Sequence, residues 1–579
     1  MALQNREIAG LFEEVANLLE IAGENPFRVR AYRNAARSIS DMGEELSGLV
    51  KEGRDLSGLP GIGKELAAKI VEALETGTLE ALAELHERIP ATVTDLLKLP
   101  GLGPKKVKVL FDELGITNLD ELKQAAEAGK VQKLPGLGAK TEKQILEAIE
   151  RQAGAEKRFL RAEITPVAEA LVAHLRAVAP EARVTIGGSY RRARETVGDL
   201  DLLADSADAA PLMDALVSQE DVAKVLAQGP TKTSVVLRSG LQVDLRVVES
   251  SSYGAALQYF TGSQAHNIAV RRLAQQKGLK VNEYGLTRDG ERVASETEES
   301  LYEALGLPWI PPELREDRGE MELRAGAVPR LVELSDLRGD LHMHSTATDG
   351  KNSIREMAEA ARERGFEYIC ITDHSKRLTM VRGLDEDRLH RQIDEIDEIN
   401  EEITGITILK GSEVDILEDG SLDLAHDVLC RLDMVIGSVH SLFKLSREKQ
   451  TERVLRAMDA PTFTLLAHPT GRLLLSRDPY DIDVPRVLEH ARQRGCFVEL
   501  NANPQRLDLD DRYCRMARDL GVLVSIDSDA HRTHDFENLR YGVGQARRAW
   551  LEKEHVLNTR PLAALRPLLA ATMGRKADT

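Results

Sequence analysis

The sequence predicts a multidomain protein that combines helical, α+β and α/β parts. The first part, up to about residue 150, repeats apolar residues at helical spacing. The middle part holds short β-like runs and one hairpin pattern, which predict an antiparallel or mixed sheet. From residue 339 to about residue 545, apolar strand-like runs alternate with helical ones, which predicts a parallel α/β barrel.

Length and composition agree with several domains. A chain of 579 residues is too long for one core and suggests three or four domains. Hydrophobic residues make up 42% of the chain, and no apolar run is long enough to span a membrane. The four cysteines are far apart and the N-terminus lacks a signal-peptide core, so we expect a cytoplasmic protein with no membrane partner, no disulfide framework and no thiolate zinc site. The formal net charge of −18 means that any DNA binding must be local.

The stretch from residue 184 to 205 carries the first candidate site. Asp199 and Asp201 lie two positions apart in a β-like run, so both carboxylates project from one face. Paired carboxylates suit Mg²⁺ or Mn²⁺. Before them, Gly188 and Ser189 open a turn with free amides and a hydroxyl, next to three arginines, Arg191, Arg192 and Arg194. An isolated Asp-x-Asp pair is more often a solvated surface feature, but its combination with an anion-binding turn is typical of nucleotidyl transfer.

A third acid strengthens this interpretation. Residues 233–248 read as a hairpin with its turn at Ser239-Gly240, and the second arm places Asp244 among apolar neighbours. A buried unpaired carboxylate is costly, so we expect Asp244 to serve either a metal or an arginine. With Asp199 and Asp201, it gives three candidate catalytic and metal-binding acids. The stretch resembles the palm of family X DNA polymerases, the polymerase beta-like nucleotidyltransferases.

The resemblance implies which residues contact the nucleotide. Gly188, Ser189 and Arg192 would hold the triphosphate of a deoxynucleoside triphosphate. Further along, the pair Tyr259 and Phe260 matches the aromatic residues that pack on the incoming sugar. The same comparison assigns a nucleotide-binding role to Gly262 and Asn267 and a minor-groove template contact to Arg271. Without the palm acids, these residues would read as an aromatic core pair and an ordinary helix surface.

Two positions depart from the family pattern. Gln264 replaces the usual acid, which puts a base-stacking contact in doubt. Gln242 stands where a basic residue often precedes the third acid, so proton transfer is expected to be tuned differently. The three acids themselves are intact.

Three similar turns punctuate the helical part, at residues 59–63, 99–103 and 134–138, each with a Leu-Pro-Gly-x-Gly pattern followed by a lysine. One such turn would be an ordinary Pro-Gly connection between helices. Three copies resemble helix-hairpin-helix motifs, which direct backbone amides at phosphates without reading sequence. The first two predict DNA contacts at Gly61, Gly63, Gly101 and Gly103. The third is expected either to bind DNA or only to pack.

The basic, aromatic segment 25–33 reads as an amphipathic helix with a solvated face or as a grip on a DNA end, for which Tyr32 is a candidate. By the family resemblance, Lys69 occupies the position of the lysine that forms a Schiff base in members that remove a 5′-deoxyribose phosphate. Phe27 and Glu65 depart from the pocket of such members, and a lysine nucleophile needs a lowered pKa. The alternative is a surface lysine that contacts phosphate.

A second candidate site begins at residue 339. His342 and His344 share a strand face, and further acids and histidines follow the ends of the strand-like runs, where barrel enzymes build their sites. Imidazole and carboxylate without cysteine suit Mn²⁺, Zn²⁺ or Fe²⁺. This half resembles the PHP (polymerase and histidinol phosphatase) family. The resemblance implies three divalent ions, Mn²⁺ or Zn²⁺, held in turn by His342, His344, Glu413 and Asp529; by Glu413, His440 and His468; and by Asp349, His374 and His531.

Other histidines and acids receive weaker roles. His390 and His490 lie in charged helical surroundings and are expected to be surface residues. Asp373, Asp415 and His534 lie close in sequence to the candidate metal ligands, so they are candidates for orienting those ligands without binding a metal themselves.

Together these patterns predict a domain order with a distorted (β/α)7 PHP barrel at its end. The expected domains are an end-binding helical domain with the first hairpin (1–85), fingers with the second and third (86–154), the palm (155–250), the thumb (251–315), a linker (316–338) and the PHP domain (339–579).

The resulting functional hypothesis is a monomeric DNA polymerase that fills gaps in DNA repair. Its partners would be gapped or primed DNA and deoxynucleoside triphosphates, and the PHP domain would add a Mn²⁺-dependent 3′→5′ exonuclease, with AP-endonuclease activity as a further candidate. Two alternatives stay open. One is a PHP phosphoesterase that acts on a small phosphate ester, and the other is a non-catalytic scaffold that binds DNA ends.

Overall fold

The computed structural model describes residues 5–40, 46–51, 54–59, 61–99, 102–152 and 157–574. The chain divides into two compact units, Met1–Lys157 and Arg158–Thr579. Along the described residues, none of the helices combines the length and the apolar character that crossing a bilayer requires.

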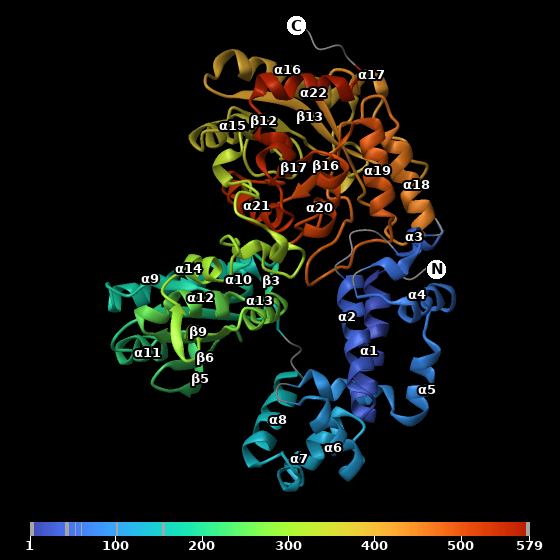
Figure 1. Cartoon of the computed structure of the whole chain (residues 1–579). Coiled ribbons are helices and arrows are strands. Elements are labelled where there is room, and N and C mark those ends of the chain that lie inside the picture. Colours follow the sequence, from blue (N-terminus) through green and yellow to red (C-terminus); the bar gives the residue numbers. More distant parts are fainter. Residues whose placement is uncertain are drawn as a thin grey trace. The chain divides into compact units, whose positions relative to one another are not determined.

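The first unit is helical, as its apolar spacing predicts, and runs from blue to cyan in Figure 1. In α1, Ile8, Phe12 and Val15 recur three and four positions apart and are fully buried. Phe12 meets Tyr32 of α2 with ring centroids 5.5 Å apart. The helices of this unit are α1 (Asn5–Ala22), α2 (Pro26–Ser40), α3 (Leu46–Lys51), α4 (Lys64–Thr76), α5 (Glu80–Arg88), α6 (Pro104–Leu114), α7 (Leu119–Glu127) and α8 (Ala139–Gln152).

The three predicted hairpin turns share one backbone geometry. In each turn, the residue between the two glycines donates its amide to the carbonyl of the leucine three positions before it. These bonds are Ile62 to Leu59 (3.0 Å), Leu102 to Leu99 (3.1 Å) and Leu137 to Leu134 (3.1 Å). The first and third turns need φ near +75°, which Gly61 and Gly136 supply. Helices α4, α6 and α8 follow directly, so each turn leads into a helix N-terminus.

The second unit opens with the predicted mixed sheet. Its strand order is β2-β4-β7-β6-β5, in which β4 and β7 are parallel and the other pairs antiparallel. The predicted hairpin is present as β6 and β7. The strands are β2 (Val184–Ile186), β4 (Asp199–Asp205), β5 (Val222–Gln228), β6 (Lys232–Leu237) and β7 (Gln242–Val248), with the small pair β1 (Phe159–Leu160) and β3 (Thr196–Val197) beside them. Helices α9 (Arg161–Val178) and α11 (Ala210–Val217) pack on the sheet, and α10 (Gly188–Arg191) is a single turn.

A helical segment and a small antiparallel sheet follow. The helices are α12 (Tyr253–Thr261), α13 (Gln264–Gln276) and α14 (Glu298–Ala304), and the strands are β8 (Lys280–Asn282), β9 (Gly285–Arg288) and β10 (Glu291–Ala294). Residues 316–338, for which the sequence predicts a linker, are packed. Glu320 and Val332 are fully buried, and the Val332 amide donates to the Leu551 carbonyl (2.9 Å). This segment therefore holds the sheet domain against the barrel.

The barrel has seven parallel strands in sequence order, which confirms the predicted fold class. The ends of the series meet through a parallel bridge between Met343 and Ala530. Its strands are β11 (Gly339–Asp340), β12 (Tyr368–Ile371), β13 (Thr407–Asp415), β14 (Met434–Ser438), β15 (Leu465–Leu466), β16 (Phe497–Asn501) and β17 (Val524–Asp527).

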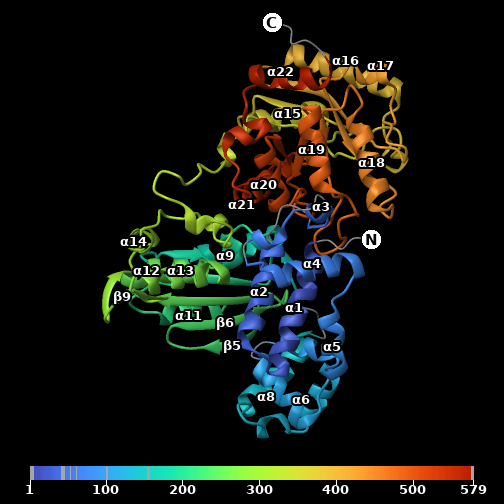
Figure 2. The same cartoon turned by 45° about the vertical axis from the view of Figure 1, so that its right-hand side comes forward.

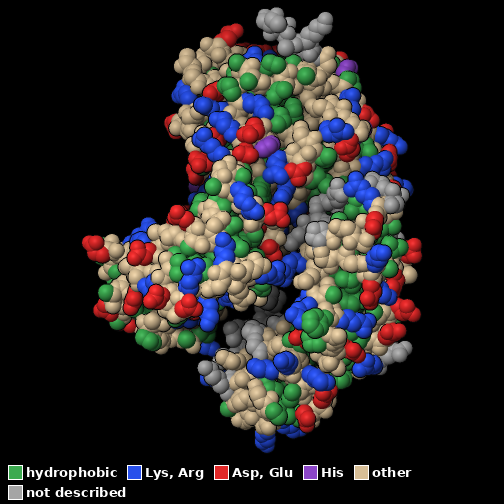
Figure 3. Space-filling model, in the orientation of Figure 1, with side chains coloured by type: hydrophobic (Ala, Val, Ile, Leu, Met, Phe, Trp, Pro, Cys, Tyr) green, Lys and Arg blue, Asp and Glu red, His purple; other side chains and the backbone are tan. Residues whose placement is uncertain are grey.

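Helices cover the outside of these strands, as Figure 1 shows. They are α15 (Ile354–Glu363), α16 (Glu386–Glu402), α17 (His426–Leu429), α18 (Arg447–Met458), α19 (Val484–Arg494), α20 (Asp511–Leu520), α21 (Leu539–Arg548) and α22 (Leu562–Thr572). The neighbours α18 and α19 lie side by side in both views (Figures 1 and 2). Basic and acidic side chains are interspersed over the barrel face in Figure 3.

Candidate active sites of the sheet domain and the barrel

The three candidate acids of the sheet domain share one face of two neighbouring strands. Asp201 on β4 lies directly beside Asp244 on the parallel strand β7. Asp199 is two residues before Asp201, and strand alternation puts it on the same side. The sequence could predict this face because it depends only on period-two alternation and one strand pairing.

The electrostatics of these carboxylates favour a nearby positive charge. Burial, with smaller contributions from Asp199 and Asp244, raises the pKa of Asp201 to about 7. Asp244 accepts a hydrogen bond from Gln242 Nε2 (3.2 Å), and its Oδ2 lies 3.1 Å from Lys232 Nζ. Lys232 was missed by the sequence reasoning. The hairpin register could have found it, since Lys232 on β6 shares a face with Ser234, the partner of Asp244.

The glycine turn lies against the acids. The amide of Gly187 donates to the Asp201 carbonyl (2.8 Å). Gly188 has a φ of +58°, and a Cβ built there would lie 2.2 Å from Asp201 Oδ2. Only glycine fits both the conformation and the contact. Ser189 follows in the single-turn helix α10, so the predicted anion-binding turn and the acids form one site.

The three arginines beside this turn do not form the open cationic cluster that the sequence suggests. The guanidinium of Arg191 is paired with Glu298 (2.8 Å), and that of Arg192 with Glu316 (3.1 Å). Burial lowers the pKa of Arg194, which faces the interior. Positive charge beside the turn is therefore largely neutralised by the protein itself, because acids far away in sequence fold back onto it.

The aromatic pair and its neighbours lie beside the acids as one connected group. The rings of Tyr259 and Phe260 meet edge to face with centroids 5.0 Å apart. Asn267 Nδ2 donates to the Tyr259 carbonyl (2.8 Å), and the Arg271 guanidinium lies 5.4 Å from the Tyr259 ring centroid. Gly262 has a φ of +68°, and a Cβ there would lie 3.1 Å from Arg192 Nη1. The predicted nucleotide contacts thus adjoin one another, and their roles remain a prediction.

The raised pKa of Asp201 predicts a pH dependence of metal binding. Below a pH of about 7 this carboxyl holds a proton that an entering cation must displace, so Mn²⁺ affinity should rise as the pH increases through 7 and level off above it. Calorimetry in two buffers with different heats of ionisation counts the protons released. Asp201→Asn, which has no such proton, is the matched control, and equal proton release by both proteins at pH 6 would contradict the prediction.

The barrel ligands converge on Glu413, at the carboxyl end of β13. Its Oε1 lies 2.9 Å from His468 Nε2 and 3.2 Å from His440 Nε2. Its Oε2 lies 2.8 Å from His374 Nδ1, 3.4 Å from His342 Nε2 and 3.6 Å from His344 Nε2. Five imidazoles from four strand ends thus surround one carboxylate, as expected for parallel strands that open at the same edge.

The remaining predicted ligands complete the cluster. Asp529 Oδ1 lies 3.2 Å from His344 Nε2, and Asp349 Oδ2 lies 3.5 Å from His374 Nε2 and 3.3 Å from His531 Nε2. Three groups have ligand atoms close enough to hold an ion. They are His342, His344 and Asp529; His374, Glu413 and His440; and His344, Asp349, His374 and His531.

This grouping differs in part from the sets that the resemblance implies. His374 joins Glu413 and His440, where the resemblance places His468, and His344 belongs to two groups. Because the rings are packed so closely, with His344 and His374 centroids only 4.3 Å apart, one imidazole can serve neighbouring positions.

Several buried ligand atoms face one another without forming a hydrogen bond, which fits a site for metal ions. Glu413 Oε2 lies 2.8 Å from His374 Nδ1 and 3.4 Å from His342 Nε2, yet none of these three atoms makes a hydrogen bond. Burial would raise the pKa of Glu413, but His374, His440 and His342 hold it well below its usual value. Buried polar atoms without partners are rare, and imidazole nitrogens with carboxylate oxygens are the donor set of Mn²⁺, Zn²⁺ and Fe²⁺.

Further acids orient the histidines from behind. Glu499 on β16 accepts from His342 Nδ1 and from the His468 amide, both at 2.6 Å. Asp415 Oδ1 lies 3.2 Å from His440 Nδ1, as its closeness in sequence suggests. Such carboxylates fix the tautomer and the ring orientation of a ligating histidine. Glu499 was missed because nothing in its own stretch separates it from an ordinary strand residue.

In the first unit, several residues predicted to contact DNA lie in the hairpin turns, and one lies in the core. Gly61, Gly63 and Gly103 lie in the hairpin turns described above, whereas Gly101 lies outside the described residues. The prediction that Tyr32 contacts DNA has to be corrected. Its side chain is only 1% exposed and packs on Phe12, because its position on α2 faces the core.

The environment of Lys69 opposes a Schiff-base role. Its Nζ lies 2.6 Å from Glu72 Oε2, and this hydrogen bond raises the pKa of the lysine. A nucleophilic amine needs the opposite shift. We therefore expect borohydride to trap no adduct between the protein and DNA that carries a 5′-deoxyribose phosphate. A trapped adduct that is lost in Lys69→Ala but kept in Lys64→Ala would contradict this.

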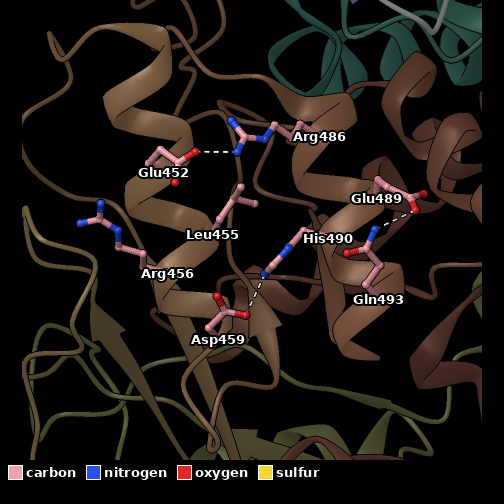
Figure 4. Close-up of a pocket in the computed structure, with 8 residues that line it drawn as sticks. All are labelled: Glu452, Leu455, Arg456, Asp459, Arg486, Glu489, His490 and Gln493. Carbon is pink, nitrogen blue, oxygen red and sulfur yellow. Dashed lines mark hydrogen bonds and ion pairs between the residues drawn. The ribbon is translucent and has the colours of Figure 1, made fainter. Parts of the chain in front are cut away.

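The hollow between α18 and α19 is not a third site of this kind (Figure 4). Glu452 pairs with Arg486 (side-chain exposures 44% and 53%), and His490 Nε2 lies 3.0 Å from Asp459 Oδ1. These are exposed pairs along a helix-helix groove, and they agree with the expected surface role of His490.

Comparisons with known proteins identify the domains in which both candidate sites lie. Family models match a helix-hairpin-helix domain (residues 3–79), a SAM-like helix-hairpin-helix tandem (93–151), the DNA polymerase beta palm (158–273) and thumb (256–316), and the PHP domain (340–503). The protein named DNA polymerase/3′-5′ exonuclease PolX from Bacillus subtilis (strain 168) is 40% identical over 564 residues, which covers 97% of this chain and 98% of that protein. This chain belongs to the PolX family. The sheet domain with its helical segment is therefore a PolX palm and thumb, and the barrel is a PHP domain.

The PHP domain also has shorter relatives. A "probable phosphatase" of Thermoanaerobacter sp. (strain X514) is 29% identical over 231 residues, and one of Caldanaerobacter subterraneus subsp. tengcongensis is 31% identical over the same length. Each match covers 38% of this chain and most of the relative, 89% and 86% respectively. PolX proteins thus share their barrel with proteins that consist of little else.

Proposed function

We propose that this protein is a template-directed DNA polymerase that fills gaps in DNA repair and trims 3′ ends with its PHP domain. The observation that carries the polymerase part is the alignment of Asp199, Asp201 and Asp244 on one sheet face beside the Gly188 turn. Burial and the neighbouring carboxylates raise the pKa of Asp201 to about 7, so a bound cation would stabilise its ionised form. The three acids would hold Mg²⁺ or Mn²⁺, which supplies the positive charge that nucleotidyl transfer requires.

The protein's own groups have distinct tasks in this proposal. Ser189 and the amides of its turn bind the triphosphate, with Arg192 as the guanidinium partner. The Tyr259 and Phe260 pair supports the incoming sugar, and Asn267 and Arg271 contact the new base pair and the template. The hairpin amides at Gly61, Gly63, Gly101 and Gly103 hold the DNA backbone without sequence preference.

The barrel would act as a phosphodiesterase that removes nucleotides in the 3′→5′ direction, with AP-endonuclease activity as an extension of the same chemistry. The nine candidate ligands, Glu413 among them, would hold up to three Mn²⁺ or Zn²⁺ ions, whose charge would polarise a phosphate ester. Glu499 and Asp415 keep the imidazoles oriented. We place the protein in the cytoplasm as a monomer.

Two reactions of the purified chain test the polymerase part and the barrel part of the proposal. The purified chain is expected to fill a one-nucleotide gap with Mg²⁺ or Mn²⁺ and, without nucleotides, to shorten a 3′-labelled strand with Mn²⁺. If the protein shows neither activity with either metal, the result would support a non-catalytic DNA-end-binding role. The phosphatase relatives favour one other candidate for the barrel, a small phosphate ester as substrate. Cleavage of a phosphomonoester without any shortening of DNA would establish that instead.

A further inference from the structure

The triphosphate turn of the palm is held from outside by the PHP domain. Arg548, at the end of α21, donates its Nη1 to the backbone carbonyl of Arg192 (2.9 Å). The next residue, Ala193, has a φ of +54°, a conformation that non-glycine residues rarely adopt, and it is buried. A Cβ added to Gly544 of α21 would lie 3.2 Å from Ala193 Cβ, so the helix packs directly on this bend.

A second set of contacts holds the C-terminal end of the same bend. Glu195 accepts from Gln545 Nε2 of α21 (2.6 Å) and pairs with Arg472 of the barrel. The segment Arg192–Glu195 is therefore bracketed by barrel side chains at both ends. A backbone conformation of this kind persists only where its surroundings enforce it.

Arg192 and Arg548 share one carboxylate oxygen. Glu316 Oε1 lies 3.1 Å from Arg192 Nε and 2.8 Å from Arg548 Nη1. Burial alone would raise the pKa of Glu316, but Arg548, Arg192 and Arg194 lower it to about 2, so the shared acid is ionised. Two guanidinium groups that compete for one oxygen each receive only part of its charge.

Arg548 is itself fixed in place. Its side chain is only 2% exposed, and its Nη2 lies 2.8 Å from Asp511 Oδ2 at the start of α20. Asp511 also accepts from Arg318 Nη1 (3.0 Å). The chain of contacts thus runs from the barrel surface through Arg548 to Glu316 and the triphosphate turn, within one compact unit.

We propose that Arg548 is a positioning residue for nucleotide binding, through which the PHP domain sets the backbone of the triphosphate turn and keeps the Arg192 guanidinium available to a triphosphate. The proposal rests on the assignment of Arg192 to the triphosphate in the proposed function. Arg548 does this in two ways. It holds the Arg192 carbonyl, and it shares Glu316, so that the ion pair of Arg192 with this acid is not exclusive. Arg192 Nη1 also donates to the Thr261 carbonyl, a neutral acceptor that a triphosphate oxygen can replace.

The test compares Arg548→Met with Arg547→Met in the full-length protein. Arg547 is the adjacent residue of α21 and also reaches across to the thumb, where it pairs with Glu313 (2.7 Å), but it has no contact with Glu316 or the turn. We expect Arg548→Met to raise the KM for deoxynucleoside triphosphates, and the Ki of inorganic triphosphate, by about 10-fold, with kcat changed less than 3-fold. Arg547→Met and the exonuclease of both variants should match the wild type.

Further variants keep the test decisive if Arg548→Met folds poorly. Asp511→Asn, which weakens the anchor of Arg548, should raise KM in the same direction. Adding Glu316→Gln to Arg548→Met should restore KM, because the acid that then retains Arg192 has lost its charge. An unchanged KM in both Arg548→Met and Asp511→Asn, or a fall in kcat alone, would overturn the proposal. An unchanged KM in Arg192→Met would instead contradict the triphosphate assignment, and a wild type that does not extend primers would contradict the proposed polymerase.

Discussion

Replacing Asp201 by asparagine is expected to reduce primer extension by about 10³-fold or more while DNA shortening by the barrel stays unchanged. The substitution keeps the shape of the side chain but removes the charge at the centre of the three acids, next to Asp244. Bound metal contributes several kcal/mol of charge stabilisation in such sites, and each 1.36 kcal/mol is a factor of ten in rate. Single-nucleotide incorporation on a gapped duplex measures the loss.

The matched control is Asp205→Asn on the same strand. Asp205 also lies on β4, but it is paired with Arg183. Its Oδ2 lies 2.7 Å from Arg183 Nη2, and its Oδ1 accepts a hydrogen bond from the Arg183 amide (2.6 Å). Its replacement should cost about 1–3 kcal/mol of stability through lost hydrogen bonds to a charged group, yet extension by the folded protein should persist. If Asp201→Asn loses no more activity than Asp205→Asn, the palm acids are not the metal site.

Local periodicity was enough to predict the positions of the ligands. Asp199 and Asp201 share a face because they are two apart in a strand, and His342 and His344 lie together in the cluster with centroids 5.2 Å apart. Glu413, near the end of β13, and the other candidate ligands, which follow strand ends, converge because the strands of the barrel are parallel. These features depend on alternation and on strand direction, both of which are visible in a single sequence.

The features that sequence reasoning missed depend on register and on contacts between domains. Lys232 meets Asp244 only through the pairing of β6 with β7. The arginines beside the triphosphate turn were expected to be open, but Glu316 and Glu298, more than a hundred residues further along, neutralise two of them. No local pattern marks such partners. Tyr32 shows a further limit, since a basic, aromatic helix does not reveal which aromatic ring faces the core.

Segment 316–338 connects the thumb to the barrel through buried charges. Proline and alternating charges predict a linker there, yet Glu320 is fully buried and its Oε1 lies 2.7 Å from His266 Nδ1 of the thumb. Arg318 in the same segment reaches Asp511 of the barrel. The palm, thumb and PHP domain are therefore packed against one another, which gives the barrel a physical route to influence nucleotide binding.

Replacing Glu413 by glutamine is expected to abolish DNA shortening, by about 10³-fold or more, and to leave primer extension intact. The neutral amide keeps the volume of the side chain but withdraws the carboxylate that lies within 3.6 Å of five imidazoles. Without it, metal ions lose their shared anionic ligand, and the imidazoles lose the charge that balances them.

Metal content and thermal stability give readouts that are independent of DNA. Wild-type protein should bind Mn²⁺ in the barrel and gain about 2.7 kcal/mol of stability when the ion is present at 100 times its Kd, whereas Glu413→Gln should show little of this gain. The control is His490→Ala, which removes an imidazole from the outer groove between α18 and α19 and should behave as wild type in both measurements. Wild-type metal content together with wild-type exonuclease in Glu413→Gln would mean that the ions are held elsewhere. Loss of exonuclease with metal retained would instead give Glu413 a role in the chemistry rather than in binding, because the two measurements separate loading from turnover.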